Sequence, residues 1–151
     1  MTTEIDSPLI HTDEHRYPQS ELTQRIIRTF FQVYNELGYG FLESVYENAM
    51  CIALKGEGFS VERQCPVPVW FRGEQIGNFC ADIVVNNSVI LELKAARALE
   101  PAFIAQLLNY LRATSIELGL VLNFGPQPSV RRLLFTNDRK KNQCSSVLIS
   151  G

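Results

Sequence analysis

Three charged side chains interrupt two neighbouring apolar segments of the sequence. Asp82 lies in the segment CADIVV, and Glu92 and Lys94 lie in the following segment VILELKA. Because the side chains of a strand alternate between its faces, Glu92 and Lys94 point the same way, opposite to the leucines beside them. An unpaired charge inside an apolar strand is costly, so these side chains need a metal ion, solvent or one another.

The length of the loop between the two segments decides whether Asp82 joins the other two residues. A two-residue loop at Asn86-Asn87 would place Asp82 and Glu92 on opposite faces of the hairpin, whereas a three-residue loop centred on Asn87 pairs them. Asparagine tolerates the left-handed backbone that a three-residue hairpin loop needs. The predicted site therefore requires the longer loop.

Two carboxylates at one place form an oxygen-rich site of the kind that a hard cation prefers. Mg²⁺, or Mn²⁺ in its place, is expected between Asp82 and Glu92, where it could polarise a phosphoryl oxygen and lower the pKa of a bound water. Lys94 would then orient the attacking water or balance charge in the transition state. The alternative is a partly buried ion pair between Lys94 and one of the carboxylates.

Helical and strand patterns follow one another along the chain in the order ααβββαββ. The third helix begins at Pro101, since proline fits the first helical position. Pro66 and Pro68 each remove a hydrogen-bond donor, so the first strand is expected at a sheet edge or with a bulge. The expected helices span residues 20–37, 42–55 and 101–114, and the expected strands span 61–71, 75–85, 89–95, 118–124 and 130–135.

Two of the helices carry polar pairs at helical spacing. Glu43 and Glu47 continue one partly apolar face near the start of the second helix, where an acid is also favoured by the helix dipole alone. Gln106 and Tyr110 lie four residues apart on the third helix and therefore share a face. These two side chains either support an active site or satisfy buried backbone groups.

The order of these residues resembles a known nuclease superfamily. A helix with an acid at its start, an Asp-bearing strand, an E-x-K strand and a further helix follow one another as in the PD-(D/E)XK nucleases. The segment Gly40-Phe41-Leu42-Glu43-Ser44-Val45-Tyr46 resembles the pattern that names the GxxExxY protein family, as do QLLNYLRAT and LGLVLNFG. The resemblance covers roughly residues 20 to 135.

The resemblance implies an α/β fold, in which helices flank a central mixed sheet of αβββαβ order, with an extra N-terminal helix. It also implies that Glu43 joins Asp82 and Glu92 in the metal site, with Glu47 as a possible substitute. Gln106 and Tyr110 resemble the QxxxY element of RecB-type nucleases. The implied catalytic residues are Asp82, Glu92, Lys94, Gln106 and Tyr110.

At 151 residues the chain is long enough for one domain, expected over residues 19–136 between a leader at 1–18 and a polar tail at 137–151. No apolar run is long enough to span a bilayer, and the N-terminus lacks the pattern of a signal or transit peptide. No membrane association and a cytoplasmic location are therefore expected, whereas the oligomeric state stays open.

The predicted function is that of a metal-dependent nuclease acting on DNA or RNA; the alternative is an inactive nuclease fold that serves as a binding or regulatory module. Net charge is only −2, but basic residues concentrate in the last part of the chain. They could face phosphate groups or form a solvated surface. These residues are Lys94, Arg97, Arg112, Arg131, Arg132, Arg139, Lys140 and Lys141.

Overall fold

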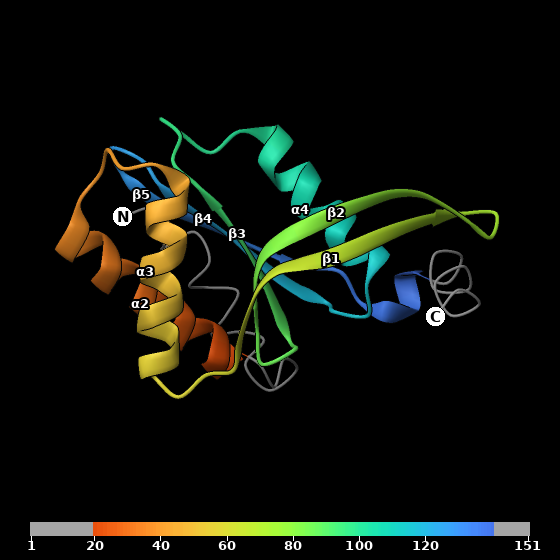
Figure 1. The fold of residues 1–151 in the computed structure, drawn as a ribbon, viewed down its shortest axis with the longest axis horizontal. Coiled ribbons are helices and arrows are strands. Elements are labelled where there is room, and N and C mark those ends of the chain that lie inside the picture. The colour runs from red at the N-terminus through yellow and green to blue at the C-terminus, as the bar shows by residue number, and fades with distance from the viewer. Residues whose placement is uncertain (1–19, 141–151) are drawn as a thin grey trace.

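A computed structural model describes residues 20–140 and shows one five-stranded sheet with helices on both faces (Figure 1). The strands lie in the order of the sequence, and β3 and β4 are parallel while every other neighbouring pair is antiparallel. The predicted mixed sheet flanked by helices is thus confirmed. The strands are β1 Val61–Phe71, β2 Glu74–Val85, β3 Val89–Lys94, β4 Leu118–Phe124 and β5 Pro128–Leu134.

Helices α2, Ser20–Leu37, and α3, Glu43–Gly56, pack on one face of the sheet, and α4, Pro101–Ala113, packs on the other. The strand β1, which contains the two prolines, lies at the sheet edge and has a register shift between Val69 and Trp70. The edge position agrees with the missing amide donors of proline. None of the described helices is long and apolar enough to cross a membrane.

The folded part of the chain continues past residue 136. A short 3-10 helix, η2, covers Asn137–Lys140, and its last residue is buried. The leader predicted at 1–18, which contains His11 and His15, lies outside the described residues, as does the tail from residue 141.

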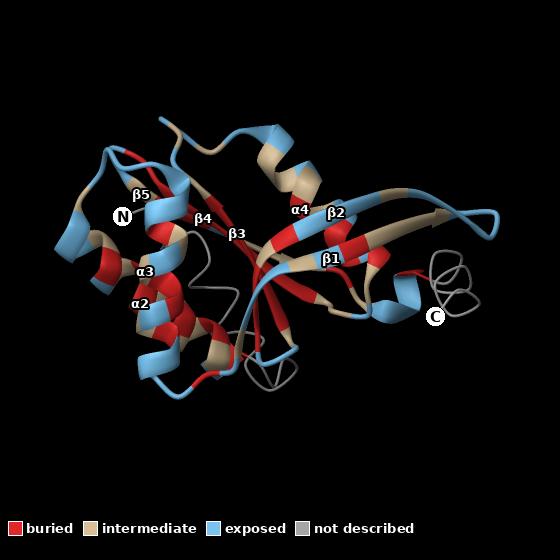
Figure 2. Cartoon of the chain, in the orientation of Figure 1, coloured by how far each residue is buried: buried red, intermediate tan, exposed pale blue. Residues whose placement is uncertain are grey.

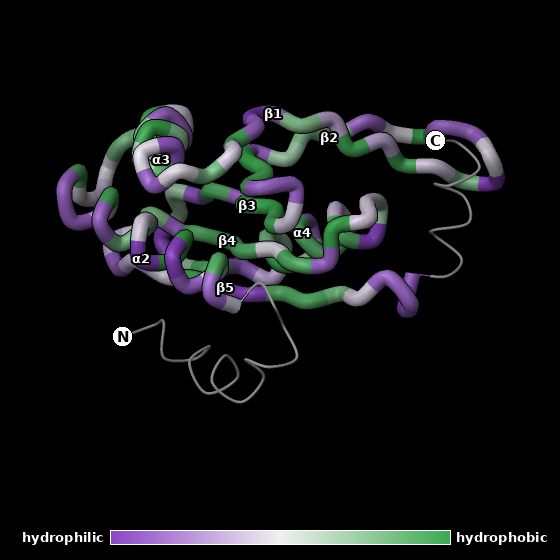
Figure 3. Tube along the Cα trace, turned by 90° about the horizontal axis from the view of Figure 1, so that it is seen from below, coloured by the Kyte–Doolittle hydropathy of each residue, from purple (hydrophilic) through white to green (hydrophobic). Residues whose placement is uncertain are grey.

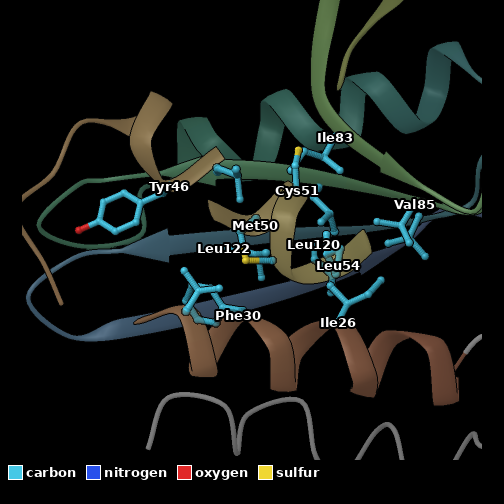
Figure 4. Packing of buried hydrophobic residues seen from close by; sticks show 14 of the residues in the cluster. Ile26, Phe30, Tyr46, Met50, Cys51, Leu54, Ile83, Val85, Leu120 and Leu122 are labelled. Carbon is cyan, nitrogen blue, oxygen red and sulfur yellow. The ribbon is translucent and has the colours of Figure 1, made fainter. Parts of the chain in front are cut away.

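The larger hydrophobic core lies between the sheet and the two helices α2 and α3. Figure 4 shows side chains of both helices meeting those of β2 and β4, and Figure 2 shows the buried stretches along the central strands. The central strands β3 and β4 are mostly hydrophobic along their length (Figure 3), because both of their faces are covered. Each fully buried large apolar side chain stabilises the fold by about 1.5–3 kcal/mol. Such side chains include Ile26, Phe30, Met50, Leu54, Ile83, Leu120 and Leu122.

Tyr46 connects this core to the loop between α2 and α3. Its buried ring stacks on Phe124 with ring centroids 4.1 Å apart. Its hydroxyl donates to the carbonyl of Gly38 at 2.6 Å and accepts from the amide of Phe41 at 3.2 Å. The final tyrosine of the GxxExxY segment therefore holds the loop that leads into Glu43.

Removal of this hydroxyl is expected to destabilise the protein. Tyr46→Phe leaves the carbonyl of Gly38 and the amide of Phe41 without their partner, which costs about 1–2 kcal/mol of unfolding free energy. Tyr39→Phe is the matched control, because Tyr39 is 58% exposed. Urea unfolding followed by circular dichroism measures both variants, and equal midpoints for the two would contradict this role of Tyr46.

Candidate active site

The loop between β2 and β3 has the three-residue length that the predicted site requires. The paired positions are Val85 with Val89, Val84 with Ile90, and Ile83 with Leu91, so residues 86–88 form the loop. The sequence predicted a single left-handed residue, but both asparagines of the loop, Asn86 and Asn87, have a φ of 53°. Asparagine adopts this conformation more readily than most residues, which accounts for both of them.

Backbone pairing between β2 and β3 ends at Ile83 and Leu91, and the two strands separate there. Beyond this pair, the side-chain carboxyls of Asp82 and Glu92 accept hydrogen bonds from backbone amides of the neighbouring strand, in place of backbone carbonyls. The backbone amide of Asp82 donates to Oε1 of Glu92 at 3.3 Å, and the amide of Leu93 donates to Oδ2 of Asp82 at 2.8 Å. We call this place the strand fork, formed by Asp82 on β2 with Glu92 and Leu93 on β3. It brings the two predicted metal carboxylates together.

The side-chain alternation of the β1–β2 hairpin also breaks at the strand fork. Ile83 belongs to the core on the α2 and α3 side, whereas Ala81 and its neighbour Val67 belong to the core on the α4 side. Gln64, which lies opposite Asp82 on β1, has a left-handed φ of 50°. Beyond the strand fork, β1 therefore contacts α4, and Figure 1 shows the hairpin crossing that helix, with its tip projecting past it.

Lys94 points toward α4 and is held by the predicted polar pair of that helix. Its Nζ donates to Oε1 of Gln106 at 2.9 Å, and Nε2 of Gln106 donates to the hydroxyl of Tyr110 at 3.0 Å. The same Nζ lies 4.9 Å from the ring centroid of Phe103. Within residues 20–140 Lys94 forms no ion pair with either carboxylate, so the ion-pair alternative is not the arrangement found.

Burial and the charges of neighbouring acids raise the pKa of both carboxyls of the strand fork. Glu92 is only 2% exposed, and its burial, followed by the charge of Asp82, raises its pKa to about 8. Burial also raises the pKa of Asp82, with further contributions from Glu47 and Glu43. Two carboxylates that resist ionising together provide a favourable place for a cation.

The donor set fits a hard divalent cation held by two carboxylates. The hydrogen bonds across the strand fork use one oxygen of Asp82 and one of Glu92, and the other oxygen of each accepts no hydrogen bond from residues 20–140. Mg²⁺ is commonly bound by one or two carboxylates and completes its shell with water. These two free oxygens are thus the available ligands.

Glu43 is not gathered with the other two acids. It is exposed at the start of α3, and among the described residues no group of three or more His, Cys, Asp or Glu side chains is placed to hold a metal ion. Its charge nevertheless contributes to the raised pKa of both Asp82 and Glu92. Glu47 accepts hydrogen bonds from Arg63 at 3.1 Å and from Gln64 at 3.0 Å, so it is already engaged.

Two further residues that the sequence analysis did not single out hold the chain just after Lys94. The fully buried Asn123 accepts from the amide of Ala96 at 2.9 Å and donates to its carbonyl at 3.1 Å. A Cβ on Gly125 would lie 2.3 Å from the same carbonyl, so this position needs glycine. An asparagine inside the apolar segment LGLVLNFG was the signal available in the sequence.

One of the basic residues that the sequence analysis assigned to a phosphate-facing or solvated surface is buried instead. Lys140 is 1% exposed, and its Nζ donates to the carbonyls of Thr114 at 2.9 Å and Ile116 at 2.7 Å. It satisfies carbonyls at the end of α4, as basic side chains often do at helix C-termini. Lys141 lies outside the described residues, while the exposed basic residues of this set are Arg97, Arg112, Arg131 and Arg139.

The carboxyl of Glu92 predicts a pH-dependent stability of the metal-free protein. Its pKa is raised from 4.5 to about 8, so between these values the folded state keeps a proton that the unfolded chain has lost. The contribution of Glu92 to stability is therefore fully present below 4.5 and is lost as the pH rises through about 8. At alkaline pH, Glu92→Gln removes the buried charge and is expected to stabilise the protein by about 1–3 kcal/mol.

Thermal unfolding in the presence of a chelator measures this difference. The gain from Glu92→Gln over the natural protein should grow as the pH rises from mildly acidic to alkaline values, whereas Glu74→Gln, at an exposed position, should follow the natural protein throughout. A gain from Glu92→Gln that is independent of pH would contradict the raised pKa.

Comparisons with known proteins give one family match and two similar solved structures. The model of the PD-(D/E)XK nuclease superfamily matches residues 20–133. Two solved structures are similar at low sequence identity. The first is the crystal structure of SSO0001, which is 16% identical with a TM-score of 0.49, over 72% of this chain and 59% of that chain. The second is an alkaline exonuclease, LHK-Exo, from Laribacter hongkongensis. It is 11% identical with a TM-score of 0.48, over 71% of this chain and 63% of that chain.

The chain thus spans less than two thirds of either solved protein. No curated protein matches it. The family model, in contrast, covers most of the chain, including the strand fork and α4. The chain therefore belongs to the PD-(D/E)XK nuclease superfamily.

Proposed function

We propose that the chain is a nuclease that hydrolyses phosphodiester bonds of DNA or RNA with Mg²⁺, or with Mn²⁺ in its place. The observation that carries this proposal is the strand fork, where Asp82 and Glu92 lie together with a free oxygen each. Lys94 lies on the same strand as Glu92, two residues further on. Membership of a nuclease superfamily supports the same reaction class.

Each residue of the site has a separate task in this proposal. Asp82 and Glu92 would hold the cation, which supplies Lewis acidity to a phosphoryl oxygen when bound. The ammonium of Lys94 would orient the attacking water or balance charge in the transition state. A lysine ammonium only donates hydrogen bonds, so Gln106 must turn its oxygen to Lys94 and its amide nitrogen to Tyr110. Gln106 and Tyr110 therefore position Lys94.

Lys94→Ala is expected to reduce cleavage by at least about 100-fold, because one preorganised charge at the transition state is lost. The measurement is Mg²⁺- or Mn²⁺-dependent cleavage of single- and double-stranded DNA and RNA by the purified protein. Lys55→Ala, at an exposed position of α3, is the control and should retain full activity. The proposal fails if no substrate is cleaved with either metal, or if Lys94→Ala cleaves at the natural rate.

Metal binding separates the nuclease from the alternative of an inactive binding or regulatory module. Calorimetry should detect Mg²⁺ or Mn²⁺ binding by the natural protein and a loss of that binding in Asp82→Ala, since one of the two carboxylates is removed. Unchanged binding in Asp82→Ala, or no binding by the natural protein, would leave the nuclease proposal without its metal site.

Glu43 is expected to contribute to metal binding, and Glu47 to the stability of the fold. Glu43 is exposed, and its charge raises the pKa of both Asp82 and Glu92. Glu43→Gln should therefore weaken metal binding severalfold and leave the free energy of unfolding unchanged. Glu47 binds Arg63 and Gln64, so Glu47→Gln should lower the free energy of unfolding by about 1 kcal/mol. Calorimetry and urea unfolding of both variants measure the two effects. A reversed pattern would assign the third acid to Glu47.

Three finer assignments belong to the same proposal. The chain is a member of the GxxExxY group within the superfamily, on the segment from Gly40 to Tyr46. The single functional domain expected over residues 19–136 is proposed here with η2, up to Lys140, as its C-terminal part. The cytoplasmic location expected from the sequence stays a prediction.

A further inference from the structure

Phe79 is a large apolar side chain that stays exposed beside the candidate active site. It lies on β2 and is 52% exposed. Its ring is 6.3 Å from that of Tyr110, centroid to centroid, with 37° between the ring planes. Tyr110 binds Gln106, and Gln106 binds Lys94. A continuous series of contacts therefore runs from the exposed ring of Phe79 to the proposed catalytic ammonium.

The ring of Phe79 has two close neighbours. Tyr110 lies on one side, and the backbone of Gly77 lies close by on the same strand. A Cβ on residue 77 would meet the Phe79 ring at 3.3 Å, so the absence of a side chain at Gly77 gives the ring its place. The ring therefore has neighbours on one part of its surface, while the rest is open to a ligand.

The break in alternation at the strand fork puts Phe79 on the side of the active site. Phe79 pairs with Val67, which belongs to the core on the α4 side, whereas Ile83 belongs to the core on the other side of the sheet. Uninterrupted alternation along β2 would place Phe79 on the face of Ile83, away from Tyr110. The same local irregularity that positions Asp82 thus brings an exposed aromatic ring to the edge of the site.

We infer that Phe79 stacks on an unpaired nucleobase of the substrate, next to the phosphate that is cleaved. Aromatic side chains bind bases of any sequence through their π faces, and such stacking requires a base whose face is free. Within a duplex the neighbouring base pairs cover those faces. The preferred substrate is therefore single-stranded or locally unpaired nucleic acid. This inference rests on the proposed function and names its substrate class.

A binding experiment tests the stacking without any cleavage. The probe is a single-stranded oligodeoxynucleotide that contains 2-aminopurine, whose fluorescence falls when it stacks, and the protein is the Lys94→Ala variant. Adding Phe79→Ala should weaken binding about tenfold and abolish the fluorescence decrease, whereas Phe79→Trp should keep both. Phe71→Ala is the matched control, because Phe71 is 55% exposed near the end of the same hairpin. Equal binding and quenching in Phe79→Ala would overturn the inference.

Cleavage by the otherwise natural protein gives the second measurement. Phe79→Ala should lower the cleavage rate of single-stranded substrate about tenfold more than it lowers the cleavage rate of a blunt duplex. An equal loss on both, or no loss, contradicts the stacking role while the nuclease proposal stands. Stacking in the binding assay without cleavage by any form would defeat the nuclease proposal and keep the stacking. If Phe79→Ala changes only the oligomeric state in light scattering, the ring belongs to a contact between protein chains and the inference fails.

Discussion

The end of backbone pairing between β2 and β3 is the constraint on which the rest of the structure depends. Every further ladder pair would fill the space at Asp82 and Glu92 with main-chain hydrogen bonds. Because pairing stops at Ile83 and Leu91, the two carboxylates take over as acceptors of the neighbouring amides. Each carboxyl uses one oxygen for a neighbouring amide, and its other oxygen accepts no hydrogen bond from residues 20–140.

This arrangement has an energetic cost that the surrounding core offsets. Glu92 is almost completely buried, and its raised pKa shows that its charged form is disfavoured without a cation. The apolar side chains of β3 and β4, covered by helices on both faces, supply stabilisation that is independent of the site. Proteins commonly tolerate such local destabilisation where a ligand later compensates the charge.

Residues at the end of β4 and on α4 position Lys94 and the chain that follows it. Asn123 and Gly125 hold the backbone at Ala96, which fixes the chain directly after Lys94. On the other side, Gln106 and Tyr110 of α4 direct the ammonium. Lys94 is thus placed from two separate elements, and β1 contacts the same helix. These supports involve residues far apart in the sequence.

The sequence by itself determined the elements, the polar pairs and the parity condition of the hairpin. Alternation, helical spacing and proline positions are local properties, so the predicted bounds agree with the structure to within about two residues. Only the tertiary structure decided that Lys94 bonds to Gln106 rather than to a carboxylate, that Lys140 is buried and that, among the described residues, no third acid is placed with Asp82 and Glu92 to hold a metal ion. These outcomes depend on the angle at which β2 leaves β3 and on how α4 packs across the sheet, and no local pattern encodes such long-range geometry.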